Sequence, residues 1–229
     1  MQLIRNSGIL MLKKSLVQAS TKVNFTKLYT RYKNHTMTPE QTFLDNLEIC
    51  YKFKHIKGCV VECGVWRGGM IAAMAEILSN QKDYYLFDSF EGLPPAQPID
   101  GKAAIEWQKN KDGSTYYNNC TAEMSFADEA MKMARVESYK LIKGWFSETL
   151  PNFNLENEIA LLRLDADWYE SMKSCLDFLY PKVKKGGIIV IDDYYIWDGC
   201  SRAIHDYLSG NNLADRIYQI NSTVYIIKT

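Results

Sequence analysis

Short apolar runs alternate with segments whose apolar residues recur at helical spacing through most of the chain. Runs with the length of buried strands lie at residues 58–62, 84–87, 139–142, 159–164 and 188–191. Helices are predicted between or after them, at residues 69–78, 169–178 and 200–208. Such alternation predicts an open, mostly parallel α/β sheet with helices on both faces.

The two ends add further elements to this pattern. Thr38-Pro-Glu-Gln41 is typical of a helix start, with Thr38 as the cap, proline at the first helical position and Gln41 completing a capping box. That helix is expected to run to about His55. Residues 216–220 and 223–228 alternate around Asn221-Ser222 and predict an antiparallel hairpin, which brings the sheet to seven strands.

The chain therefore divides into an N-terminal arm, residues 1–37, and a single domain, residues 38–229. The arm is basic with scattered apolar residues, and it is open whether it frays, docks as an amphipathic helix or contacts a second subunit. We expect the last of these, because a complete core follows it, and so predict a homo-oligomer. Residues 93–137 are too long for a simple connection and are predicted to form a lid over a site.

Acidic residues stand where buried strands end. Asp165 and Asp167 follow the run 159–164, and Asp192 and Asp193 follow the run 188–191. The tips of adjacent parallel strands lie ~4.8 Å apart, so these acids are expected to converge. A hard cation such as Mg²⁺ would relieve their repulsion. The alternative is that Asp192-Asp193 caps the next helix while Asp165 pairs with Arg163.

A glycine-rich turn, Glu62-Cys-Gly-Val-Trp-Arg-Gly-Gly69, follows the first strand and opens a helix. Gly64 permits a tight turn, while Gly68 and Gly69 would let a ligand approach the backbone. Asp88 ends the second strand, where a carboxylate can accept the ribose hydroxyls of a nucleoside. The turn lacks the G-x-G-x-x-G fingerprint, which weakens a dinucleotide interpretation.

Composition narrows the class of protein. Lys+Arg and Asp+Glu both number 27 and hydrophobic residues make up 47%, which favours a packed core and gives no sign of a nucleic-acid partner. Six cysteines without C-x-x-C spacing indicate reduced thiols, and no apolar run approaches the ~18 residues of a membrane span. We therefore expect a cytoplasmic protein without a transmembrane segment.

Several longer motifs occur in a fixed order: the turn at 62–69, then FDSFEGLP (87–94), GWFSETLP (144–151), LRLDADWYES (162–171) and the Asp-Asp-Tyr at 192–194. Together they resemble the macrocin-type O-methyltransferases over about residues 58–208. The resemblance implies a class I methyltransferase fold, S-adenosylmethionine as methyl donor, a bound Mg²⁺ and a sugar hydroxyl as acceptor. It leaves open which sugar or glycoside is methylated.

The resemblance also implies roles for individual residues. Asp165, Asp192 and Asp193 match the metal ligands, with Asp165 acting in metal-assisted catalysis. Glu62 matches the acid that holds the methionine amine of the donor. The expected donor-binding set is Glu62, Gly64, Trp66, Arg67, Gly68, Asp88 and Ser89.

Some roles stay open at this level. The related catechol-type enzymes place a lysine base where this chain has Trp168. Either the metal alone acidifies the hydroxyl, or an unassigned base lies elsewhere, for example in the lid over residues 93–137. Asp167 is a candidate only for contact with the substrate. Its side chain is expected to point in a different direction from that of Asp165. Arg67 either reaches the donor carboxylate or caps a turn, while Trp145 and Phe146 either wall the adenine pocket or belong to the core. His205 is expected to pack.

Two other functions compete with an O-methyltransferase. An NAD-dependent oxidoreductase shares the strand order and the acid for the ribose, but it would leave the three metal aspartates unexplained. A non-catalytic nucleoside-binding protein of the same fold would have no need of those carboxylates.

Overall fold

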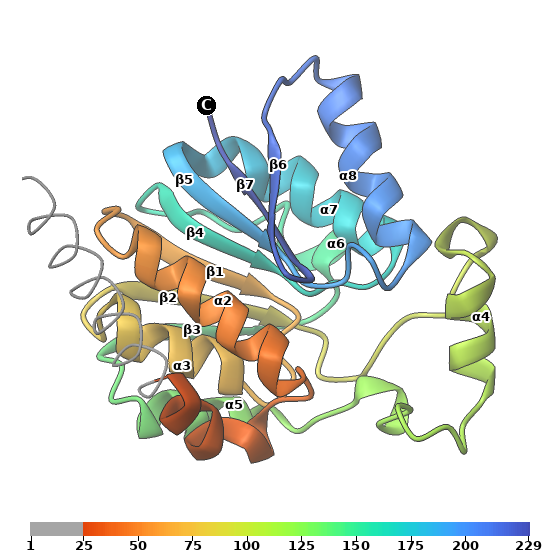
Figure 1. Cartoon of the computed structure of the whole chain (residues 1–229), viewed down its shortest axis with the longest axis horizontal. Helices are drawn as coiled ribbons and strands as arrows, with labels where there is room; N and C mark the ends of the chain where they lie inside the picture. Colours follow the sequence, from red (N-terminus) through yellow and green to blue (C-terminus); the bar gives the residue numbers. More distant parts are fainter. Residues whose placement is uncertain (1–24) are drawn as a thin grey trace, which may run out of the picture.

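The computed structural model describes residues 25–229, which form one layered α/β domain (Figure 1). Its seven-stranded sheet has the order β3-β2-β1-β4-β5-β7-β6. β7 runs antiparallel to β5 and β6, while the other neighbouring strands are parallel. The predicted fold and its C-terminal antiparallel hairpin are therefore confirmed.

The strands lie close to the predicted apolar runs. Their bounds are β1 Cys59–Cys63, β2 Asp83–Asp88, β3 Ser138–Lys143, β4 Ile159–Leu164, β5 Val183–Ile191, β6 Ile217–Ile220 and β7 Thr223–Ile227. β1, β4 and the second half of β5 are buried on both faces, as expected of central strands covered by helices.

Helices cover both faces of this sheet (Figure 1). One face carries the helix over residues 25–32 with α2 (Glu40–Phe53), α3 (Gly69–Leu78) and α5 (Met124–Met133). The other carries α6 (Phe146–Thr149), α7 (Tyr169–Leu179) and α8 (Asp198–Gly210). Alternate residues of β1 enter the two cores: Val60 packs with α3, and Val61 packs with α7.

The described part of the N-terminal arm packs against its own domain. Phe25 and Tyr32 are buried with α2 and α3, and Tyr32 donates a hydrogen bond to Glu76 Oε1 at 2.5 Å. Arg31 adds an ion pair with the same carboxylate at 3.0 Å. The premise that the arm has no partner within the core is thus wrong for residues 25–37. Residues 1–24 of the predicted arm lie outside the described residues.

The long segment between β2 and β3 has two distinct parts. Residues 89–123, which we call the excursion, leave the sheet (Figure 1). They carry the short helix α4 (Lys102–Lys109) and 3-10 turns at Pro98–Asp100 and Asn118–Cys120. α5 instead buries Ala127, Ala130 and Met131 against the sheet. The excursion is therefore shorter than the predicted lid, because α5 is an ordinary crossover helix of the layered fold.

The start of α2 differs from the predicted capping box. Pro39 occupies the N-cap position, and no side chain caps the helix. Gln41 donates to Asp45 Oδ1 at 2.8 Å, one turn further along the helix. None of the described helices is long and apolar enough to cross a membrane.

The order of strands places a switch point between β1 and β4, since the chain builds outward from β1 in both directions. Cys63 and Leu164 are paired at the adjoining strand ends, and the Asp165 amide donates to the Cys63 carbonyl at 2.9 Å. Crevices at such points are the usual ligand sites of open parallel sheets.

Candidate active site

A cavity of about 440 Å³ opens at the carboxyl ends of the parallel strands. The glycine turn after β1 and the tips of β2, β4 and β5 contribute to its walls, together with residues 92–120 of the excursion. Of the predicted site residues, it is lined by Gly64, Trp66, Asp88, Ser89, Asp165, Asp167, Asp192 and Asp193. The structure therefore brings the glycine turn and the four strand-end aspartates together.

Asp88 shapes the glycine turn directly. Its Oδ2 accepts the amides of Val65 at 2.7 Å and Trp66 at 2.8 Å, and its Oδ1 accepts the amide of Phe90 at 2.7 Å. Burial raises the pKa of this carboxyl, whereas these amides lower it. Asp88 thus supports the turn as well as facing the cavity.

The turn needs glycine at three positions, because neighbouring protein atoms leave no room there for a Cβ. Gly64 has φ +85°, and a Cβ there would lie 1.7 Å from the Asp165 carbonyl oxygen. Cβ atoms at Gly68 and Gly69 would meet Ala127 of α5 at 2.9 Å and the His35 carbonyl at 2.6 Å. For Gly68 and Gly69 the structural reason is thus close packing, where the sequence suggested close approach of a ligand.

Three predicted donor-binding residues are not among those lining the cavity. Gly68 faces α5, and Glu62 is buried behind the strand tips. Arg67 stacks on Trp66 and Phe126 at 4.4 and 4.7 Å and donates to the Asn34 carbonyl at 3.3 Å. This stacking holds one face of the Trp66 ring.

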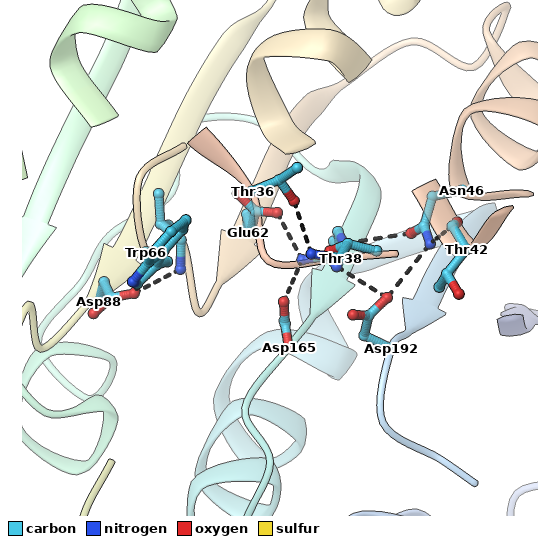
Figure 2. Close-up of polar contacts among 11 residues, drawn as sticks. Thr36, Thr38, Thr42, Asn46, Glu62, Trp66, Asp88, Asp165 and Asp192 are labelled. Carbon is cyan, nitrogen blue, oxygen red and sulfur yellow. Dashed lines mark hydrogen bonds and ion pairs between the residues drawn. The ribbon is translucent and has the colours of Figure 1, made fainter. Parts of the chain in front are cut away.

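Arg163 of β4 lies at the centre of an ionic cluster. Its Nη1 lies 2.9 Å from both Glu62 Oε1 and Asp165 Oδ2, and its Nη2 lies 2.9 Å from Asp192 Oδ1. Its Nε donates to Asn46 Oδ1 of α2 at 3.3 Å. Figure 2 shows these partners converging from three strands and one helix. The pair between Asp165 and Arg163, an alternative to metal binding from the sequence, is thus present within a larger cluster.

A second cluster contains only carboxylates. One oxygen each of Asp165, Asp167 and Asp193 lies within 4.8 Å of the others, a spacing that suits a shared cation. Asp167 therefore lies close to Asp165 and Asp193, although the sequence suggested a different direction for its side chain. It adopts a left-handed backbone with φ +51°, and its Oδ1 accepts the indole N–H of Trp197 at 3.0 Å. α8 has no side-chain cap, so helix capping does not explain Asp192-Asp193.

Burial and mutual repulsion raise the pKa values of Asp167, Asp192 and Asp193. Burial raises the pKa of Asp167 to about 8, with Asp165 adding repulsion. Burial likewise raises the pKa of Asp192 to about 6, although Arg163 opposes the shift. The pKa of Asp193 also lies well above its ordinary value, through burial and its acidic neighbours. The buried Oδ2 of Asp193 has no hydrogen-bond partner among the described residues, so the cluster has the charge and free oxygens that fit a divalent cation.

A group of three tryptophans that the sequence did not single out as a unit joins the excursion to this cluster. Trp107 of α4, Trp168 and Trp197 pack edge to face, with ring centroids 5.2 to 6.2 Å apart. Trp168 is buried, and its indole donates to the Pro94 carbonyl at 2.9 Å. The position of the lysine base in catechol-type enzymes is thus filled by a tryptophan that anchors the excursion. Only the aromatic content of the chain hinted at such a group.

The remaining candidates with aromatic rings are Trp145, Phe146 and His205. Trp145 and Phe146 both line the cavity, although Phe146 also packs on the adjoining core. His205 shares a hydrogen bond of 2.7 Å with the Tyr194 hydroxyl. None of the residues lining the cavity in the described part of the chain is a histidine, so the imidazoles offer no base here.

Strand order, the glycine turn after β1 and the acid ending β2 define a class I methyltransferase. The family model described as macrocin-O-methyltransferase (TylF) matches residues 10–228. The chain belongs to this family and is an O-methyltransferase, and the family implies S-adenosylmethionine as donor. The oxidoreductase and non-catalytic alternatives are therefore set aside.

Curated relatives and solved structures agree with this assignment. The tetracenomycin-C 4'-O-methyltransferase of Streptomyces olivaceus, which is named for a dimethoxy-rhamnosyl substrate, is 32% identical over 200 residues, 82% of this chain and 73% of the relative. The mycinamicin III 3''-O-methyltransferase of Micromonospora griseorubida is 30% identical, covering 82% and 75%. The solved O-methyltransferase NovP superposes with a TM-score of 0.70 at 27% identity, covering 85% of this chain and 82% of that one.

Proposed function

We propose that this protein uses S-adenosylmethionine and Mg²⁺ to methylate a sugar hydroxyl of a neutral glycoside. The observation that carries the proposal is the carboxylate cluster of Asp165, Asp167 and Asp193, which lies in the same cavity as the glycine turn. The curated relatives named for methylation of glycosylated natural products support the acceptor class.

The donor site is assigned to the glycine turn and the acids beside it. Oε1 of Glu62 accepts a hydrogen bond from Arg163, while the buried Oε2 of Glu62 lacks a hydrogen-bond partner among the described residues. That free oxygen suits the methionine amine. The Trp66 indole N–H is also buried without a partner in the described chain, and Gly64, Asp88 and Ser89 form the adjoining wall.

The metal is assigned to Asp165, Asp192 and Asp193, the set implied by the family resemblance. Asp165 and Asp193 belong to the carboxylate cluster, whose third member, Asp167, is not in that set. All three line the cavity, and Arg163 engages only one oxygen each of Asp165 and Asp192. When bound, Mg²⁺ would lower the pKa of an acceptor hydroxyl. Asp167 is then placed to receive a hydrogen bond from that hydroxyl, because Trp197 orients it within the same cavity.

The acceptor is proposed to be uncharged because of the cavity wall. Among the residues that line it in the described chain, the charged ones are all aspartates and none is lysine or arginine. A nucleoside diphosphate sugar would meet this acidic wall without a basic partner. Beyond the aspartates, the wall offers large apolar side chains that suit an apolar aglycone: Leu93, Trp107, Tyr117, Ile196 and Trp197.

An acceptor panel tests this directly. With S-adenosylmethionine and Mg²⁺ supplied, methyl transfer is expected to neutral deoxyhexosides bearing an aromatic or polyketide aglycone, and to be far weaker with the matching sugar nucleotides. Mass spectrometry of the products gives the position of methylation. Preference for the sugar nucleotides would contradict the neutral-acceptor proposal and leave the donor chemistry standing.

Replacing Asp88 is expected to weaken donor binding. Asp88→Ala removes the acceptor for two amides of the turn, so the binding free energy of S-adenosylmethionine should fall by about 1.5–3 kcal/mol. Isothermal titration measures the change. Asp83→Ala, at the opposite end of the same strand, is the matched control and should leave the affinity unaltered. An unchanged affinity in Asp88→Ala would remove this residue from the donor site.

A homo-oligomer formed through residues 1–37 remains part of the proposal. Because residues 25–37 pack on their own domain, the subunit contact is assigned to residues 1–24, whose composition is basic and apolar. Light scattering at micromolar concentration should give a mass above that of one 26.4 kDa chain. Deletion of residues 1–24 should return it to one chain, and a single-chain mass for both proteins would refute the contact. A cytoplasmic location and the lack of a nucleic-acid partner stay predictions.

A further inference from the structure

The proposed reaction assigns no role to Arg163, a buried arginine of β4. It is 1% exposed and is the last residue but one of β4, yet it belongs neither to the cavity wall nor to the apolar cores around it. Burying a guanidinium is costly unless its donors are used. Here its partners are an acid assigned to the donor, Glu62, and two acids assigned to the metal, Asp165 and Asp192.

Arg163 contacts one oxygen of each of these three acids. Arg163 Nη1 donates hydrogen bonds to Oε1 of Glu62 and Oδ2 of Asp165, and Nη2 forms an ion pair with Oδ1 of Asp192. One oxygen of each carboxylate is thereby fixed on the guanidinium, and the second is left to face another group. For Glu62 that second oxygen is buried without a hydrogen-bond partner in the described chain.

The guanidinium is itself held from outside the site. Asn46 of α2 accepts from Arg163 Nε at 3.3 Å, and its amide donates to the Thr42 carbonyl at 2.9 Å. The same amide lies 3.4 Å from Asp192 Oδ1. Figure 2 shows Asn46 approaching the cluster from the side opposite Glu62. A planar fork with fixed donors can hold several carboxylates at set angles, which a lysine ammonium cannot do.

We propose that Arg163 is a positioning residue that joins the donor site and the metal site into one unit. By fixing one oxygen of Glu62, Asp165 and Asp192, it presents the others to the donor amine and to the cation at a constant separation. This inference rests on the proposed function of those acids. Its consequence is that a single substitution outside both binding surfaces impairs both binding events.

The test measures the two affinities separately in purified full-length protein. S-adenosylhomocysteine is titrated without divalent metal, and Mn²⁺ is titrated without nucleoside and followed by electron paramagnetic resonance. Arg163→Lys keeps the charge but loses the fork. Both affinities should fall at least about tenfold, the loss expected from one charge-assisted hydrogen bond. Arg202→Lys, on the exposed side of α8, is the matched control and should change neither.

Asn46→Ala keeps the inference testable if Arg163→Lys does not fold. Asn46 contacts Arg163 and Asp192 but does not line the cavity. Of these two partners only Arg163 contacts the donor acid Glu62, so a weaker affinity for S-adenosylhomocysteine is expected to pass through the guanidinium. A several-fold loss is expected there as well, with Asn152→Ala on the surface as the control.

The outcomes separate the inference from the function on which it rests. If the wild-type protein binds neither probe, the proposed function fails and the inference fails with it. If the wild type binds both, folded variants that lose one affinity alone, or neither, overturn the role of Arg163. Arg163→Lys is also expected to lower kcat. This loss should persist at saturating donor and metal, because occupancy of the two sites does not restore their separation.

Discussion

Removal of divalent cations with EDTA is expected to abolish methyl transfer, and added Mg²⁺ should restore it. The proposed ligands lie at the tips of β4 and β5, and the raised pKa values of Asp192 and Asp193 reflect burial and repulsion that a cation would relieve. Affinity for S-adenosylhomocysteine should change little in EDTA, because the glycine turn and Asp88 form the nucleoside wall. Full turnover in EDTA would remove the metal from the proposal.

Variants of the acids assign the ligands. Asp165→Asn, Asp192→Asn and Asp193→Asn should each lose turnover together with Mn²⁺ affinity, since an amide keeps the shape but lacks the charge that a divalent ion requires. Asp167→Asn should lose turnover while keeping Mn²⁺ affinity, because that side chain is assigned to the acceptor hydroxyl. The close approach of Asp165, Asp167 and Asp193 sets the competing result. If Asp167→Asn loses the metal and Asp192→Asn retains it, the ligand set is the one given by that approach.

Gly64→Ala is expected to be the most destabilising single substitution in the site. Its Cβ would lie 1.7 Å from the Asp165 carbonyl oxygen, and the backbone at φ +85° disfavours any L side chain. β1 and β4 would have to separate at their tips. We expect a loss of about 3 kcal/mol or more of unfolding free energy, together with loss of donor binding.

Gly186→Ala separates the two causes of that loss. Gly186 has φ +78°, almost the same backbone strain, but no atom of the described chain lies within 4 Å of the position that a Cβ would take there. Its cost should be about 1–2 kcal/mol. Thermal unfolding should show the difference, since about 1 kcal/mol corresponds to roughly 2–4 °C in a domain of this size. Equal shifts in the two variants would mean that backbone strain, and not the contact with Asp165, sets the requirement for Gly64.

Local patterns were sufficient for the layers of the fold. The apolar run 159–164 and the helix 69–78 have the same bounds in sequence and structure, because a buried strand and a buried helix each show their period over a short window. The positions of the strand-end acids followed from the same reasoning, since parallel strands end at one edge. The start of α2 was less predictable, because a proline with extended backbone took the N-cap in place of Thr38.

The excursion shows where local pattern was insufficient. α5 was grouped with the lid because it follows a polar, proline-containing stretch without a break in the sequence. Its alanines are buried only because α3 and the sheet lie beside them. Trp107, Trp168 and Trp197 come from separate segments, so their contact exists only after the chain has folded.

The sequence by itself determined the class of fold, the family and the edge of the sheet where the acids gather, because each depends on residues close together in the chain or on motifs in a fixed order. Only the tertiary structure decided which acids face one another. Arg163 forms an ion pair with one oxygen of Asp192, while the side chain of Asp167 lies close to Asp165 and Trp197. Those choices depend on side-chain directions at strand tips and on a partner from α2, Asn46, that lies 117 residues away from Arg163 along the chain.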